Sequence, residues 1–282
     1  MVTDSLLTQR FEMKYLVREE TALAIRRYLS CFMTPDEFAV TQPDYAYPVH
    51  SLYLDSSELA TFHAVEASEK NRFKLRLRYY GANDATIYFE IKRRTNEVIT
   101  KMRAGVRREA VQGLLDGRPP KLEHLAKPGP RQLVELQEFC RLMRRLSATP
   151  RSHVAYLREA WMSRSNNSLR VTFDRNVECE PEFSSALRTR RGLAVTPFQR
   201  QVILELKFVD RLPRWCLEMI QMFDLVRSGA PKYAYGVLML GEHKLSNRGV
   251  GITLPAPQPV ERPRGLPVRV PGLVGTPAVA VA

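Results

Sequence analysis

The sequence predicts an α+β protein in which about eight antiparallel strands close into a barrel covered by helices. Three observations predict this class. Extended runs alternate along the chain with amphipathic helical runs, short polar links at residues 81–84 and 163–167 join extended runs as hairpins, and charged residues gather on one face of most strands. Hairpins interrupted by helices favour α+β over a doubly wound parallel sheet. Eight strands are enough to close a barrel.

The first half of the chain supplies five of the predicted strands and two helices. The run RFEMKYLV at residues 10–17 alternates charged with apolar residues, and so do RFKLRLRYY at 72–80 and TIYFEIKRR at 86–94. Residues 49–55 and 97–103 are the other two strand candidates. Amphipathic stretches at 19–32 and 58–67 predict the helices.

The second half continues the alternation and ends in a different kind of sequence. Helices are predicted at 107–115, 132–146 and 214–227, and strands at 152–161, 168–174 and 202–208. From residue 249 to residue 282 the chain is rich in Pro and Gly and shows neither the helical nor the strand periodicity. We therefore expect a folded domain over 1–248 and a disordered, partly polyproline-like tail over 249–282.

Composition narrows the class of partner. Lys and Arg number 43 against 30 Asp and Glu, which gives a formal net charge of +13. This surplus favours a polyanionic partner: nucleic acid, an acidic membrane or a phosphate-rich small molecule. The cysteines and histidines form no CxxC, HxH or HExxH pattern, so zinc or histidine-driven catalysis is poorly supported.

The sequence shows no targeting or membrane-spanning pattern. No basic segment followed by an apolar one begins the chain, and no stretch of about 20 apolar residues occurs. We therefore expect a cytoplasmic protein without a transmembrane segment.

The strand at 72–80 carries the most informative pattern. Side chains alternate between faces, so Arg72, Lys74, Arg76 and Arg78 share one face. One wet, charged face is common in antiparallel sheets, but four like charges in succession repel, and a solvated strand usually mixes signs. If the helices cover the apolar faces, the charged faces line the barrel. Such a lining is stable only when it is wet and filled by anions.

A few acids interrupt the basic faces. Glu12, Glu90 and Glu205 have two interpretations: ion pairs that compensate neighbouring cations, or ligands that share Mg²⁺ or Mn²⁺ with substrate phosphates. The chain has no GxxxxGK[ST] loop and no kinase HRD or DFG motif, which argues against the familiar ATPase and kinase machinery.

Six motifs carry a resemblance to a known family. They are, in order, RFEMKYLV, LRLRYYG, FEIKRR, SLRVTFD, ILELK and PKY. Together they resemble the VTC domain, the polyphosphate polymerase branch of the CYTH-like triphosphate tunnel metalloenzymes, over about residues 8–240. The resemblance implies an eight-stranded antiparallel tunnel that binds ATP and inorganic polyphosphate with Mn²⁺ or Mg²⁺. It also implies transfer of the ATP γ-phosphate to phosphate or to a growing polyphosphate chain, and it allows a separate membrane partner.

The resemblance also implies roles for individual residues. Arg76 and Arg78 match the paired arginines that grip the triphosphate, and Glu205 matches the metal-binding glutamate; these three are the expected catalytic residues. The further phosphate-binding residues that it implies are Lys14, Lys92, Lys101, Tyr156, Arg158, Arg170 and Lys232. Arginine forks bind phosphate oxygens bidentately, whereas lysine acts as a point charge.

The chain departs from the family pattern at two places. Lys232 is followed by Tyr233, Ala234 and Tyr235 where the family typically has a serine and a second lysine, so a neighbour such as Lys207 or Lys244 must compensate. Arg10 stands where general tunnel enzymes carry an acid, which disfavours a two-metal triphosphatase.

Other functions remain open at this point. A hydrolase that acts on tripolyphosphate or nucleotides, and a non-catalytic module that binds polyphosphate or RNA, share the basic lining. The aromatic residues of the basic strands alternate away from the basic face, which disfavours base stacking and a specific nucleic acid partner. The basic cluster at 141–145 is typical of a solvated helix face, with a membrane surface as the alternative.

Overall fold

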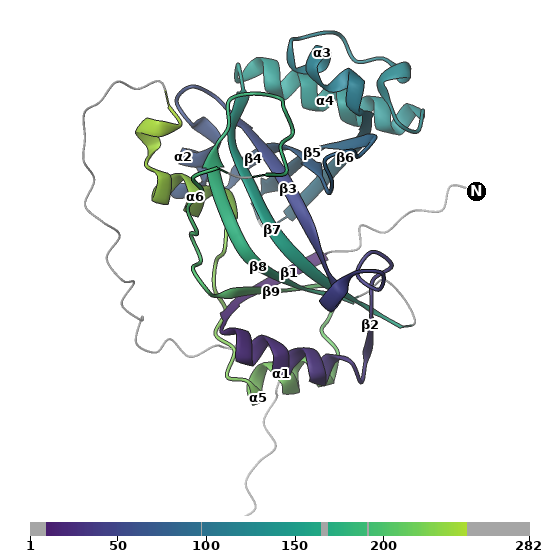
Figure 1. Cartoon of the computed structure of the whole chain (residues 1–282), viewed down its shortest axis with the longest axis vertical. Coiled ribbons are helices and arrows are strands. Elements are labelled where there is room, and N and C mark those ends of the chain that lie inside the picture. Colours follow the sequence, from purple (N-terminus) through teal and green to yellow (C-terminus); the bar gives the residue numbers. More distant parts are fainter. Residues whose placement is uncertain (1–9, 97, 165–168, 191, 247–282) are drawn as a thin grey trace, which may run out of the picture. The chain divides into compact units, whose positions relative to one another are not determined.

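The computed structural model describes residues 10–96, 98–164, 169–190 and 192–246 (Figure 1). The strands are β1 (Arg10–Val17), β2 (Met33–Pro35), β3 (Ala46–Asp55), β4 (Asn71–Tyr79), β5 (Thr86–Thr95), β6 (Val98–Arg107), β7 (Thr149–Ser163), β8 (Leu169–Pro181) and β9 (Val202–Val209). The helices are α1 (Glu19–Leu29), α2 (Ala60–Glu66), α3 (Val111–Leu115), α4 (Pro130–Arg145), α5 (Arg214–Met222) and α6 (Lys232–Leu240). All strand pairs are antiparallel, so the predicted α+β class is confirmed.

Each predicted strand and helix is present within the described residues, with shifted ends. The structure adds β2 and α6, which were not predicted, and extends β8 to Pro181. The link at 81–84 is the predicted hairpin turn, whereas part of the link at 163–167 and the tail at 249–282 lie outside the described residues.

The sheet is open rather than closed. Its strands follow the order β1-β9-β8-β7-β3-β4-β5-β6, and β2 pairs separately with β7. The described backbone shows no pairing between β1 and β6, so the closed eight-stranded barrel that we expected is not confirmed. The sheet is nevertheless curled, as shown by the distance of 3.2 Å between Lys92 Nζ on β5 and Glu12 Oε1 on β1.

Loop segments occupy the two edges that would have to pair. The backbone N–H of Ser228 donates to the carbonyl of Lys14 at 2.8 Å, beside an isolated bridge from Tyr15 to Arg227. At the other edge, the N–H of Ala126 donates to the carbonyl of Gly105 at 2.9 Å. These bonds satisfy edge groups that β1 and β6 would otherwise offer to each other.

Helices cover the apolar faces of the strands, as the alternation predicted. Figure 1 shows α3 and α4 against β5 and β6, and α1 and α5 against β1 and β9. The α4 side chain of Phe139 packs edge-on against Phe89 of β5, with ring centroids 4.8 Å apart. A third core lies between α2, α6 and strands β3, β7 and β8. With these faces covered, the charged faces turn inward. The described part of the chain contains no helix with the length and apolarity needed to cross a bilayer.

Close packing of α6 on β8 depends on Gly236. A Cβ at this position would lie 2.6 Å from Sγ and 2.9 Å from Cβ of Cys179. We expect Gly236→Ala to lower the free energy of unfolding by about 1–3 kcal/mol, because the core is overpacked there. Urea unfolding measures this change. Gly229→Ala, where a Cβ meets nothing within 4 Å, is the control. Partial restoration by Cys179→Ala in the Gly236→Ala background, which removes Sγ but keeps Cβ, would identify the clash, and equal stability of both glycine variants would refute it.

Candidate active site

The inward faces of six strands enclose a cation-rich cavity of about 140 Å³. We call it the cation cage. Eight of the described residues that line it are Lys or Arg, against one carboxylate: Lys14, Lys74, Arg76, Arg78, Lys92, Arg158, Lys207 and Lys232, with Glu205. Tyr53, Tyr156, Ala230 and Pro231 complete the lining. This concentration of positive charge in a confined space suits the cage to a polyanion.

Most of the site residues implied by the resemblance meet here. Those that line the cage are Lys14, Arg76, Arg78, Lys92, Tyr156, Arg158, Glu205 and Lys232. Lys101 does not line the cage; its Nζ lies 2.6 Å from Glu90 Oε1. Arg170 points elsewhere: its Nη2 donates to Asp36 Oδ2 at 2.7 Å. Phosphate contacts by any of these residues remain predictions.

Three of the cage residues with polar side chains were not proposed as site residues: Lys74, Lys207 and Tyr53. Lys74 and Lys207 lie two positions from Arg76 and Glu205 on the same strand faces, so period-two alternation alone identifies them. Tyr53 gave no such signal, because β3 carries no Lys or Arg.

Glu90 holds the paired arginines of β4. It faces Arg76 across the β4–β5 pair, and its Oε2 lies 2.7 Å from Arg76 Nη2 and 3.9 Å from Arg78 Nε. Burial disfavours its charge, but Arg76, Arg78 and Lys101 outweigh this and hold the pKa of Glu90 well below its usual range. The ion-pair interpretation of Glu90 is therefore confirmed, and the pair fixes the orientation of the Arg76 fork.

Asp174 of β8 plays the same part for Arg158 of β7. Its two oxygens accept from Arg158 Nε and Nη2 at 2.7 and 2.8 Å, and Lys232 Nζ lies 2.7 Å from Oδ2. Burial raises the pKa of Asp174, but Arg158 and Lys232 reverse this and lower it below its ordinary value. The bidentate pair orients Arg158 toward the cage.

Glu205, which lines the cage, and Glu12, which lies beside it and contacts Lys14, form the acidic side of the site. Glu205 is 4% exposed, and its Oε1 lies 3.3 Å from Lys207 Nζ and 3.7 Å from Lys14 Nζ. Lys207 and Lys14 lower the pKa of Glu205 well below its ordinary value despite burial. Lys14 also contacts Glu12 Oε1 at 2.8 Å. Although burial opposes its charge, the two carboxylates raise the pKa of Lys14.

The acidic side suits a hard divalent cation that is shared with a ligand. Mg²⁺ in proteins is typically held by one or two carboxylates together with substrate phosphates and water. Glu205 and Glu12 supply carboxylates of this kind beside a space for phosphate. A separate acidic group consists of His63, Glu66 and Glu242, whose ligand atoms lie within 4.8 Å of one another. It lines neither the cage nor a second, larger cavity of the molecule.

Two cage groups titrate near neutral pH. Burial, together with the nearby cations Lys92 and Lys14, lowers the pKa of Lys74 to about 8. Burial alone would raise the pKa of Tyr53, but the charges of Arg76 and Lys74 lower it to about 8. The two groups are coupled, because the charge of Lys74 is one of the causes that lower the pKa of Tyr53. Raising the pH through 8 therefore lowers the net charge of the pair, by loss of a proton from Lys74 or from Tyr53, and this weakens the binding of an anion.

We expect tripolyphosphate affinity to fall about tenfold between pH 7 and 9 for each proton that this pair loses. Lys74→Arg keeps the charge at position 74 throughout this range, so the variant should lose only the part of the pH dependence that Lys74 causes. Calorimetric titration at several pH values measures both profiles. The ligand's own titration is common to both proteins, and Lys127→Arg, on an exposed residue outside the cage, serves as the control. Identical profiles for the Lys74→Arg and unmodified proteins would contradict the prediction.

Comparisons with known proteins can now be set beside this geometry. A family model described as the VTC domain matches residues 9–240. A search of curated proteins gives no match. Among solved structures, a putative adenylyl cyclase from Hippeastrum with a dominant triphosphatase activity is 16% identical, with a TM-score of 0.44, 80% of this chain covered and 94% of that one. A protein from Pyrococcus horikoshii OT3 is 9% identical, with a TM-score of 0.42, 82% of this chain covered and 99% of that one.

The family match includes all the strands and helices that build the cage. Residues 9–240 run from the strand that carries Lys14 to the helix that begins at Lys232. The chain therefore belongs to the VTC domain family.

Proposed function

We propose that this chain is a polyphosphate polymerase that transfers the γ-phosphate of ATP to phosphate or to the end of a polyphosphate chain. The observation that carries the proposal is the cation cage, in which eight Lys and Arg residues face one lining carboxylate. Membership of the VTC domain family supports the same activity. Phosphoryl transfer depends on positioning and on charge neutralisation more than on covalent chemistry, and the cage provides both.

The arginines suit the task of holding the transferred group. Glu90 orients Arg76, and Asp174 orients Arg158, so two forks are pre-positioned, one on β4 and one on β7. They would bind the non-bridging oxygens of adjacent phosphates while the lysines balance the remaining charge. In the transfer, the bond between the γ-phosphorus and the β–γ bridging oxygen breaks. A terminal oxygen of the acceptor forms the new bond, and ADP leaves with the electron pair.

Glu205 and Glu12 are the residues that would hold Mn²⁺ or Mg²⁺. When bound, the cation neutralises charge on the phosphates and on the departing ADP. Lys14 and Lys207, which contact Glu205 within 4 Å, would keep this carboxylate ionised and turned toward the ligand.

The departure after Lys232 leaves the cage well supplied with cations. The side chain of Lys232 contacts Asp174, whereas Ala234 is buried in the core and Tyr235 stacks on Phe198. Lys207 lines the cage and can replace the family's second lysine; Lys244 does not line it. The structure thus supports an active site despite the altered motif.

Product analysis tests the proposal. The purified protein is incubated with ATP, Mn²⁺ and a short polyphosphate primer, and the products are resolved on a gel, with a chelator-treated sample as control. A ladder that is sensitive to exopolyphosphatase and absent with chelator is the expected result. Free phosphate without polymer would identify a hydrolase. Polyphosphate binding without either product would identify a binding module.

A further inference from the structure

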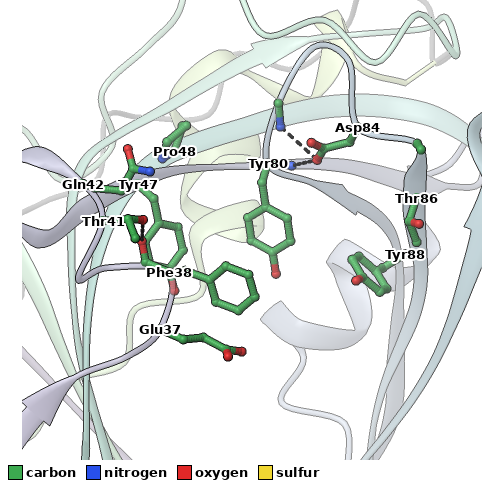
Figure 2. A pocket seen from close by; sticks show the side chains of 12 residues that line it. Glu37, Phe38, Thr41, Gln42, Tyr47, Pro48, Tyr80, Asp84, Thr86 and Tyr88 are labelled. Atoms are coloured by element: carbon green, nitrogen blue, oxygen red, sulfur yellow. Dashed lines mark hydrogen bonds between the residues drawn. The ribbon is translucent and has the colours of Figure 1, made fainter.

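A second and larger cavity, of about 610 Å³, lies at one end of the curled sheet (Figure 2). Four aromatic side chains line it: Phe38, Tyr47, Tyr80 and Tyr88. We call it the aromatic mouth. None of these side chains belongs to the cage, so the proposed chemistry gives them no role.

The aromatic mouth continues the inward face that forms the cage. Tyr80 follows Arg78 by two positions, and Tyr88 stands directly opposite Arg78 in the β4–β5 pair. Tyr47 stands opposite Arg158 in the β3–β7 pair. Residues of this parity share a face of the sheet. The expectation that aromatics alternate away from the basic face is therefore wrong for Tyr80 and Tyr88.

The charge of the wall changes sharply between the two cavities. Among the described residues that line the aromatic mouth, none is Lys or Arg, whereas Glu37 and Asp84 are present. Asp84 accepts the backbone N–H groups of Tyr80 and Gly81 at 2.6 and 2.9 Å and so stays beside the opening. Two carboxylates and a set of aromatic rings attract a phosphate chain less than the cage does, although Arg103 lies over the Tyr88 ring at 3.5 Å. They suit a neutral, planar group instead.

Phe38 and Tyr80 form a slot for such a group. Their rings are nearly parallel, at 4°, with centroids 6.5 Å apart, and Figure 2 shows them next to one another at the cavity. A base stacked between them needs about 7 Å between the ring planes, two contacts of about 3.5 Å each, so the rings must separate to admit it. Phe38 is 62% exposed, so its side chain can move outward slightly to admit a ring.

The distance between slot and cage matches one linear ligand. Arg76 and Tyr80 are four residues apart along an extended strand, which is about 13 Å. Two phosphate linkages and a ribose can cover this distance. We propose that the aromatic mouth binds the base of a nucleoside triphosphate, stacked against Phe38 and Tyr80, while its phosphates occupy the cage. This inference rests on the proposed function, because it needs the triphosphate in the cage.

Paired binding measurements test the inference. ATP and tripolyphosphate are each titrated calorimetrically in the presence of a chelator, so that no turnover occurs. Phe38→Ala should weaken ATP binding about tenfold, the range expected for loss of one base–aromatic stack, and should change tripolyphosphate binding by less than about twofold. Phe38→Tyr should retain ATP affinity. Phe183→Ala removes a similarly exposed phenylalanine that lines neither cavity and should change neither affinity.

The two ligands separate this inference from the proposed function. If tripolyphosphate binds but Phe38→Ala leaves ATP affinity unchanged, the base site is overturned and the phosphate cage stands. If Phe38→Ala weakens both ligands equally, the residue acts on the cage and the base site is again overturned. If the unmodified protein binds neither ligand, even when Mn²⁺ replaces the chelator, the proposed function falls, and the base site falls with it.

Discussion

Glu205→Gln is expected to lower the rate of phosphoryl transfer at least about 100-fold while tripolyphosphate binding stays equal or becomes tighter. The amide keeps the shape of the side chain but removes a charge that would hold the divalent cation, and the loss of several kcal/mol of transition-state stabilisation corresponds to this factor. It also removes the one carboxylate among the described residues that line the cage, so the remaining cations attract an anion more strongly. Single-turnover rates with ATP and primer, together with calorimetric titration, measure the two effects.

Glu218→Gln is the matched control for this experiment. Glu218 lies on α5, half exposed, where it pairs with Arg214, and its loss should leave both quantities unchanged. Partial recovery of the Glu205→Gln rate at high Mn²⁺ would support a metal-binding role. A variant that keeps more than a tenth of the rate at ordinary Mn²⁺ would refute it.

Asp174→Asn should destabilise the empty protein by about 3–5 kcal/mol, since it leaves Arg158 and Lys232 buried without their partner. Asp174 has no exposed surface, so solvent cannot compensate. Tripolyphosphate should recover part of this loss, because an anion in the cage neutralises the same cations and binds only the folded protein. Urea unfolding with and without tripolyphosphate measures the free energy of unfolding.

The loss of stability caused by Asp174→Asn should also depend on pH. The pKa of Asp174 is lower in the folded protein than in the unfolded chain, so its contribution is complete above the unfolded value of about 3.9 and is lost as the pH falls through the folded value. The stability difference between the two proteins should therefore narrow in acid. Asp210→Asn, at an exposed position, should be neutral. Equal stability of the Asp174→Asn and unmodified proteins at pH 7 would contradict the assigned role.

Strand periodicity predicted much of the cage because like charges on one strand face repel unless an anion neutralises them. The run from Arg72 to Arg78 identified the inward face of β4, and the same parity extends to Tyr80, where its meaning changes from phosphate binding to stacking. Pairing between strands could not be predicted in the same way. That Glu90 stands opposite Arg76 depends on the β4–β5 register, which tertiary packing fixes.

Helix α6 escaped prediction for a local reason. Its sequence, KYAYGVLML, is nearly uniformly apolar and contains a glycine, so it shows no polar face by which a surface helix is recognised. The helix exists because β8 and the core around Tyr233 receive it on several sides. Its start places Lys232 beside Asp174, a contact that only the folded chain could reveal.

The order of strands in the sheet also determines when the domain can complete its folding during synthesis. Within the described sheet, β1 pairs with β9 alone, whose residues follow roughly 190 positions later in the chain. At about 5–20 residues per second, the ribosome needs on the order of 10–40 s to make that partner. During this interval Phe11, Met13 and Tyr15 have no apolar surface of β9 to cover them. The final assembly of the cage, which takes Lys14 from β1 and Glu205 from β9, must therefore wait until most of the domain has left the ribosome.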